Sequence, residues 1–173
     1  MPEKSQLYGH CVVHICDFRT SKVKIYGIEV WGAAKKTILN PILILQKRIS
    51  RVILFKGINH HSAPLFNELK MMDVFQQYRY MICIFMHDLI NNKLPHKFID
   101  YFSFLDHPYQ TRNKQKCNIK ITTIKTDLGK QSISYSGPLI WNNLSLDLRK
   151  IPVRKRFSQE LKKYLLEINK STS

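Results

Sequence analysis

The chain has 173 residues, 44% hydrophobic and 11% aromatic, which is enough for one domain with an apolar core or for two small subdomains, and argues against general disorder. Its 28 Lys and Arg residues against 12 acidic residues give a formal net charge of +16. Because such a charge opposes compaction, a polyanionic partner, either nucleic acid or an anionic membrane, accounts for it better than a basic surface without a partner.

Helical patterns begin after residues 1–25, which have no clear pattern of their own. A compact apolar segment, Tyr26–Gly32, ends at a glycine. Asn40 followed by Pro41 is typical of a helix start, and the residues after it predict a basic amphipathic helix that ends near Gly57. Its apolar face is expected to comprise Leu45, Ile49, Val52 and Ile53, and its basic face Lys47, Arg48 and Arg51.

Three further helices are predicted between residues 62 and 105. Ser62 caps a short helix, Asp73 caps a longer one that runs to Asn91 or Asn92, and Pro95 begins the third. The short helix is expected to bury Leu65, Phe66 and Leu69. Spacing of three and four residues marks the buried face of the longer helix, which comprises Val74, Tyr78, Met81, Ile82, Phe85 and Leu89. The inward-facing residues of the third are Phe98, Ile99 and Phe102.

The rest of the chain divides into a basic arm and a C-terminal helical segment. Cys117, Ile119 and Ile121 alternate with polar residues, which predicts a short strand or an extended arm. A short helix follows Ser136–Pro138, and a last helix from about Arg154 to Ile168 buries Phe157, Leu161, Tyr164, Leu165 and Ile168. We therefore predict a mainly α fold with a divergent segment over 1–25, a helical subdomain over 26–105, an arm over 106–131, a helical segment over 132–168 and a frayed tail over 169–173.

The cations are distributed as a phosphate-binding surface would require. Lys and Arg neutralise phosphates with an affinity that depends strongly on salt and little on sequence. They lie on the first basic helix, on the arm and at the start of the last helix, whereas acidic residues gather from Glu68 to Asp106. The expected nucleic-acid-binding residues are Lys47, Arg48, Arg51, Arg112, Lys114, Lys116, Lys120, Lys130, Arg154, Lys155 and Arg156. Tyr109 and Tyr135 flank the arm, either as stacking residues or as edges of the core.

No catalytic group emerges from the sequence. A two-metal polymerase or nuclease site needs converging carboxylates, and no two acidic residues are adjacent here. Cys83 and His87 have the spacing of a nucleophile and a base on one helix, but Cys83 lies between two isoleucines and is more simply a buried thiol. The single glycines form no phosphate-binding loop. We expect no catalytic residue, metal or cofactor in this chain.

The cysteines and histidines bear on metal binding and on the cellular compartment. His10, Cys11, His14 and Cys16 are ligand types that zinc accepts, but no second Cys/His cluster follows, so a local coincidence explains them better. Scattered cysteines and no evident signal peptide predict reduced thiols in an intracellular protein of the nucleus or cytoplasm. No apolar run approaches the roughly 20 residues of a membrane span, and we expect no membrane partner.

Four blocks of sequence follow one another over about 140 residues: YGIEVWG (26–32) with LQKR (45–48), HSAPLF (61–66), TRN (111–113), and GKQSISYSGPLIWNN (129–143) with LKKYL (161–165). Together they resemble the C-terminal region (thumb and post-palm) of LINE-type, jockey-like non-LTR retrotransposon reverse transcriptases. In that family the catalytic aspartates lie in an upstream palm, and their (F/Y)xDD box is absent here. The resemblance therefore implies a thumb-like helical bundle that grips template–primer, with the early basic helix near the duplex backbone.

Two segments depart from the family pattern, so alternatives to this interpretation remain. Residues 7–25 lack its apolar helix with a proline, and 143–146 lacks the proline of its NxLP turn, so a looser turn is expected before the last helix. The leading hypothesis is a fragment of an RNA-directed DNA polymerase that lacks the palm and binds RNA, DNA or their hybrid, with the missing polymerase core as a further partner. The alternatives are a small helical protein-interaction module and a non-functional relic.

Overall fold

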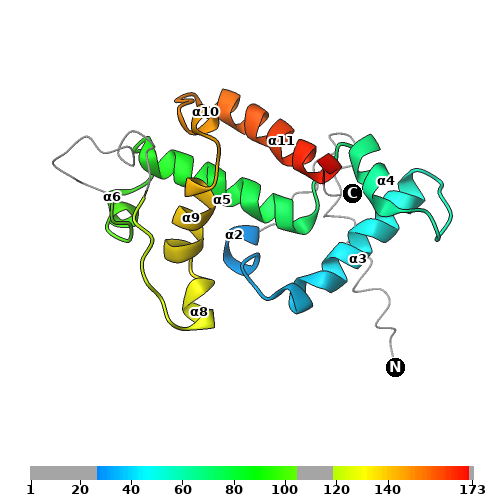
Figure 1. The fold of residues 1–173 in the computed structure, drawn as a ribbon, viewed down its shortest axis with the longest axis horizontal. Coiled ribbons are helices and arrows are strands. Elements are labelled where there is room, and N and C mark those ends of the chain that lie inside the picture. Colours follow the sequence, from blue (N-terminus) through cyan, green and yellow to red (C-terminus); the bar gives the residue numbers. More distant parts are fainter. Residues whose placement is uncertain (1–26, 105–118, 172–173) are drawn as a thin grey trace.

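The computed structural model describes residues 27–104 and 119–171, which are mainly helical, as predicted (Figure 1). The helices are α2 (Ile28–Trp31), α3 (Lys36–Ile53), α4 (Ser62–Glu68), α5 (Val74–Ile90), α6 (His96–Ile99), α8 (Asp127–Lys130), α9 (Ile133–Asn142), α10 (Leu146–Arg149) and α11 (Arg154–Ser171). An isolated antiparallel bridge joins Phe104 and Ile119, in the place where a short strand was predicted.

Helix α5 is the central element of the fold. It packs against α9 and α11, and near its start against α2 and α3, so that α11 lies along one side of it and α9 along another (Figure 1). The predicted buried face is confirmed, with Val74, Tyr78, Ile82 and Leu89 buried and Met81 and Phe85 partly buried against the same core. Cys83 and Met86 are also fully buried, because α5 is covered on more than one side.

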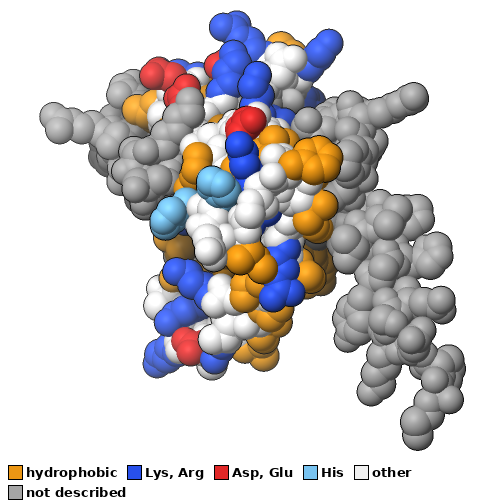
Figure 2. Space-filling model, turned by 90° about the vertical axis from the view of Figure 1, so that its right-hand side faces the viewer, with side chains coloured by type: hydrophobic (Ala, Val, Ile, Leu, Met, Phe, Trp, Pro, Cys, Tyr) orange, Lys and Arg blue, Asp and Glu red, His pale blue; other side chains and the backbone are white. Residues whose placement is uncertain are grey.

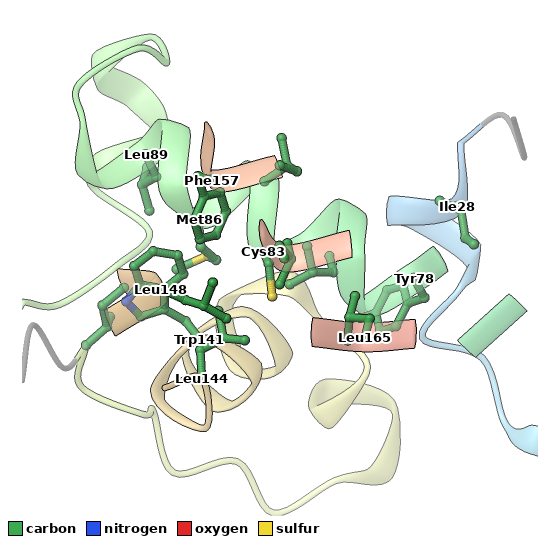
Figure 3. Close-up of a cluster of buried hydrophobic side chains, with 14 of the residues drawn as sticks. Ile28, Tyr78, Cys83, Met86, Leu89, Trp141, Leu144, Leu148, Phe157 and Leu165 are labelled. Atoms are coloured by element: carbon green, nitrogen blue, oxygen red, sulfur yellow. The ribbon is translucent and has the colours of Figure 1, made fainter. Parts of the chain in front are cut away.

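The core lies where α5, α9, α10 and α11 meet. Figure 3 shows Met86 and Cys83 from α5 facing Trp141 from α9, with Leu148 and Phe157 beside them. The predicted buried face of α11 is confirmed, because Phe157, Leu161 and Leu165 are buried and Tyr164 packs partly against the core. α11 runs three residues beyond its expected end, to Ser171.

Hydrogen bonds from three side chains fix the start of α5. Asp73 and Gln76 form a capping box, in which the Asp73 carboxylate accepts from the Gln76 N–H and the Gln76 amide oxygen accepts from the Asp73 N–H. The same Gln76 donates through Nε2 to the Leu165 carbonyl of α11 at 2.6 Å. Gln46 of α3 accepts from the Val74 N–H at 3.0 Å. The predicted cap at Asp73 is therefore confirmed, and it lies where three helices converge.

Helix α3 differs from its prediction in where it begins. It starts at Lys36, and Pro41 lies inside it rather than at its first position. Leu39 is almost fully buried, and its burial fixes the turn that precedes the proline. In an unbroken helix, an N–H at position 41 would donate to the Thr37 carbonyl, and Pro41 has no N–H. Because both residues are exposed, water can donate to that carbonyl instead, and the missing hydrogen bond costs little.

The buried face of α3 was also predicted wrongly in part. Leu45 and Val52 are 43% and 73% exposed, whereas the buried residues of this helix are Leu39, Gln46 and Ser50. Apolar residues occur on two sides of α3, and periodicity alone does not tell which side faces the core. Ile42 and Leu43 pack against the core, and they lie on the side of Leu39 and Gln46.

Three helices end in the same hydrogen-bonded turn, with a non-glycine residue in the left-handed region. Phe55, Lys70 and Asn92 have φ values of 50°, 49° and 53°. At the end of α3, the Lys56 N–H donates to the Arg51 carbonyl and the Phe55 N–H to the Val52 carbonyl, which is the Schellman pattern. Glycine is the usual residue at this position because it lacks a Cβ, so Phe55 carries local backbone strain.

Replacing Phe55 with glycine is expected to raise the free energy of unfolding by about 1 kcal/mol, since it removes the left-handed strain of a side chain that buries no surface. Urea denaturation followed by circular dichroism measures this. Phe55→Ala is the control, because it removes the ring and keeps the Cβ. An equal gain in both variants would show that the ring, and not the backbone, is responsible.

The C-terminal half departs from prediction around its glycine and prolines. α9 begins at Ile133 and encloses Gly137 and Pro138, which were expected to precede it. A Cβ on Gly137 would lie 2.8 Å from the Met86 sulfur, so the glycine lets α9 approach α5 closely. The looser turn expected over 143–146 stays a prediction, but residues from Leu146 form a short helix that was not predicted, α10, which buries Leu148.

Two smaller differences concern the segment before the arm and the end of the arm itself. α6 is a single turn, and Phe98 is exposed although its ring meets Phe85 edge-on at 5.9 Å, so only Ile99 and Phe102 turn inward as predicted. At the other end, Asp127–Lys130 of the predicted arm forms α8, which packs on α9.

Candidate nucleic-acid interface

The cations of α3 lie on the side of the helix away from the core. Arg48 is exposed, and Lys47 and Arg51 are half-buried. Arg51 donates from Nε to the His60 carbonyl at 3.0 Å, which fastens the loop after α3 to the helix. Lys47 and Arg48 form no ion pair with an acidic side chain in the described part of the chain. They are therefore the predicted α3 residues that are available to phosphate.

A second group of cations begins α11. Arg154, Lys155 and Arg156 are exposed and occupy its first turn, which contains no acidic residue. Arg154 lies with Nε 3.2 Å from Oδ2 of the buried Asp88 and so ties the start of α11 to the end of α5. These cations repel one another and the positive end of the helix dipole, and a bound phosphate offsets that repulsion. Lys155 and Arg156 are the available members of this group.

The arm returns to the core at a fixed place. The Asn142 side chain accepts from the Ile119 N–H at 3.0 Å and donates to the Ile119 carbonyl at 2.8 Å, and the Lys120 N–H donates to the Ser103 carbonyl at 2.9 Å. Lys120 is thus an exposed cation on an anchored backbone. Lys130 lies 3.8 Å from Asp127, an exposed pair of little energetic weight.

Several predicted residues of the arm cannot be placed. Arg112, Lys114 and Lys116 lie outside the described residues, as does Tyr109. Tyr135 is half-buried in α9, and neither of its two predicted roles is decided by that position.

The cations of α3 and those of α11 form two separate areas rather than one cluster, and Lys120 and Lys130 belong to neither. The α3 group lies beside the start of α5, through Gln46 and Val74, and the α11 group lies beside its end, through Arg154 and Asp88. Since α5 rises 1.5 Å per residue, these two ends are roughly 20 Å apart. Figure 1 shows α3 and the start of α11 at opposite ends of α5.

The end of the molecule formed by α3 and α4 is seen in Figure 2. Lys and Arg side chains there are interspersed with exposed hydrophobic side chains, and acidic side chains are few. This agrees with the sequence, in which residues 30–67 contain no Asp or Glu.

The pair Cys83 and His87 is part of the core. Burial raises the pKa of the Cys83 thiol to about 12, so the thiol stays protonated at neutral pH and is a poor nucleophile. His87 is fully buried, its Nε2 lies 2.9 Å from the Ile151 carbonyl, and its ring stacks on Phe157 with centroids 4.4 Å apart. The expectation that Cys83 is a buried thiol is confirmed. Burial also raises the pKa of Tyr78, whose hydroxyl donates to Ser136.

Sequence reasoning missed the buried polar residues that position these surfaces. Asp88 is an acidic residue near the C-terminal end of α5, where the helix dipole disfavours a negative charge. This position could have indicated from the sequence that Asp88 has a cationic partner. Gln46 and Asn142 gave no comparable sign, because an amide on a helix is usually solvated.

The structure adds two observations on metals and membranes. Among residues 27–104 and 119–171, no group of three or more His, Cys, Asp or Glu side chains could hold a metal ion, and the segment His10–Cys16 lies outside these ranges. None of the described helices is long and apolar enough to span a membrane.

Comparison of the chain with family models, curated proteins and solved structures found no match.

Proposed function

We propose that this chain binds nucleic acid through the phosphate backbone, as the thumb-like C-terminal part of a retrotransposon reverse transcriptase that lacks its palm. The observation that carries the proposal is the unneutralised charge at both ends of α5. Lys47 and Arg48 at one end, and Lys155 and Arg156 at the other, lack acidic partners among the described residues. Contacts to phosphates supply most of the affinity of such a surface and carry no sequence information.

The finer part of the proposal, a reverse transcriptase thumb, rests on the sequence blocks. Residues of those blocks have packing roles here: Trp141 fills the core, Asn142 holds Ile119, and Gly137 lets α9 approach α5. None of these residues is a catalytic carboxylate. Their packing roles support the proposal that the shared blocks specify a helical scaffold, which would grip template–primer.

The proposal is tested by the salt dependence of binding to a labelled RNA–DNA primer–template, measured by fluorescence anisotropy. We expect the affinity of the whole chain to fall steeply as salt is raised. Lys47→Gln with Arg48→Gln should reduce the slope of log affinity against log salt by up to about 2, because each lost phosphate contact contributes about 0.9. Arg51 is kept, since it fastens the loop after α3.

A matched control removes the same charge elsewhere. Lys93 and Lys97 are exposed near α6, in the acid-rich part of the chain, and changing both to Gln should leave the slope nearly unchanged. A slope that falls equally in both variants would assign the effect to net charge alone. Binding that does not depend on salt, or no binding, would contradict the proposed function.

A further inference from the structure

The outer side of α3 carries a row of exposed apolar residues, here termed the α3 strip: Ile38, Leu45 and Val52. They follow one another at seven-residue spacing, and Ile38 is 64% exposed. Phe55 and Ile58, directly after the helix, are exposed as well. From Ile38 to Phe55 the row extends over about 25 Å. Seven-residue spacing is the pattern of a helix that packs along a second helix.

Helix α3 departs from an ordinary surface helix at four positions. Gln46 and Ser50 face the core and are buried, while Leu45 and Val52 face water. Single exposed apolar residues are common, but a row of them along one helix marks an interaction surface.

Phe55 strengthens this inference independently. It is 96% exposed, and its backbone is in the left-handed region, where glycine would be free of strain. The exposed ring of Phe55 therefore adds nothing to the stability of the fold, while its backbone strain lowers that stability. Aromatic residues of this kind frequently supply most of the binding energy of an interface.

The charge around the strip selects the partner. Residues 30–67 contain no acid, and Lys47, Arg48 and Lys56 lie on or beside α3. We propose that the α3 strip is the docking site of an acidic amphipathic helix from another protein, with Leu or Ile at seven-residue spacing against the strip and Glu or Asp toward Arg48, which is three residues from Leu45 and four from Val52. This goes beyond the proposed nucleic-acid binding, and such a helix would cover Arg48 and compete with phosphate there.

Two other occupants fit less well. A second copy of the chain would bring the cations of two α3 helices together, and like charges across an interface oppose association. In a lipid bilayer, Arg48, which lies among the exposed residues of the same helix, would enter the apolar layer without a counter-charge. A carboxylate on a partner helix pairs with it instead.

The test uses the whole chain and a synthetic helical peptide of about 18 residues, long enough to cover the strip, with Leu at the apolar positions of each heptad and Glu on both flanks. A peptide of the same composition in scrambled order is the probe control. Fluorescence anisotropy should show that the patterned peptide binds at least about tenfold more tightly than the scrambled one. Leu45→Ser with Val52→Ser should weaken that binding by about tenfold or more.

The matched control variant replaces two exposed apolar residues far from α3. Leu128→Ser with Val153→Ser should leave peptide binding unchanged. Because all four side chains are exposed, both variants should keep the circular dichroism spectrum and melting behaviour of the parent chain. The strip variant should also keep the salt slope for nucleic acid, which separates the failure of this proposal from the failure of the proposed function.

Four results would overturn the proposal. Equal binding of the scrambled peptide would show attraction by charge alone, and full binding by the strip variant would place the contact elsewhere. Sedimentation equilibrium that shows a dimer of the parent chain, lost in the strip variant, would make a second copy the occupant. Adsorption to phosphatidylserine vesicles, lost in the strip variant and without peptide binding, would make it a membrane.

Discussion

Replacing Phe157 with alanine is expected to lower the free energy of unfolding by about 4 kcal/mol, the typical cost of removing a fully buried aromatic ring. Its ring stacks on His87 and lies 5.9 Å from the ring of Trp141, so its loss opens a cavity between α5, α9 and α11. These helices cannot easily collapse into the space, because Gly137 already holds α9 close to α5. Urea denaturation followed by both circular dichroism and tryptophan fluorescence measures the change.

The control for Phe157 is Val153→Ala, one helical turn earlier on the same segment. Val153 is exposed, and its substitution should change the stability by less than about 0.5 kcal/mol. Phe157→Leu should lie between the two, because it refills part of the cavity. A loss below about 1 kcal/mol for Phe157→Ala would mean that the core formed by α5, α9 and α11 is not the stable centre of the fold.

Replacing Gly32 with alanine is expected to destabilise the chain by about 3 kcal/mol, a typical upper value for overpacking. The backbone at Gly32 is right-handed, so alanine is conformationally acceptable, and the cost is entirely steric. The added Cβ would collide with the Ile28 carbonyl oxygen and would lie 2.5 Å from the Tyr78 ring. Neither can move freely, because Ile28 and Tyr78 belong to the buried core. Thermal melting by circular dichroism measures this loss.

Gly57 provides the matched comparison, since a Cβ there meets nothing within 4 Å. Gly57→Ala should be neutral or stabilise by a few tenths of a kcal/mol, through loss of freedom in the unfolded chain. If both glycine variants behave alike, the close packing of α2 against α5 is wrong.

The helices that the sequence predicted best bury a single face or begin at a recognisable N-cap residue. α11 has a single apolar row between cations, and Asp73 with Gln76 is a capping pair that needs no tertiary information. In α5, which is covered on several sides, the predicted face was confirmed, but the burial of Cys83 and Met86 depends on α9 and α11.

The main errors arose where tertiary contacts override a local signal. Pro41 and Pro138 each indicate a helix start, yet both lie inside helices whose preceding turn is held by buried residues. In α3, two apolar sides compete, and the buried side is chosen by Gln46, which pairs with the start of α5. A hydrogen bond between residues 28 positions apart cannot be read from periodicity.

The candidate interface was predicted as a set of residues, but their individual roles needed the structure. Arg51 and Arg154 bind a carbonyl and a carboxylate of the same chain, whereas Lys47, Arg48, Lys155 and Arg156 face outward. The sequence offers no means to separate these two kinds of cation, because the acceptors, His60 and Asp88, are brought to them only by folding.

The position of α5 in the chain has a consequence for its synthesis. Its buried faces are covered mainly by α9 and α11, and the contact of Gln76 with Leu165 joins residues 89 positions apart. A ribosome adds roughly 5–20 residues per second, so about 70 residues separating the end of α5 from the middle of α11 take roughly 4–15 s to appear. During that interval the buried side chains of α5 lack the partners that α9 and α11 later supply. Its need for a chaperone or a binding partner is therefore greatest before synthesis is complete.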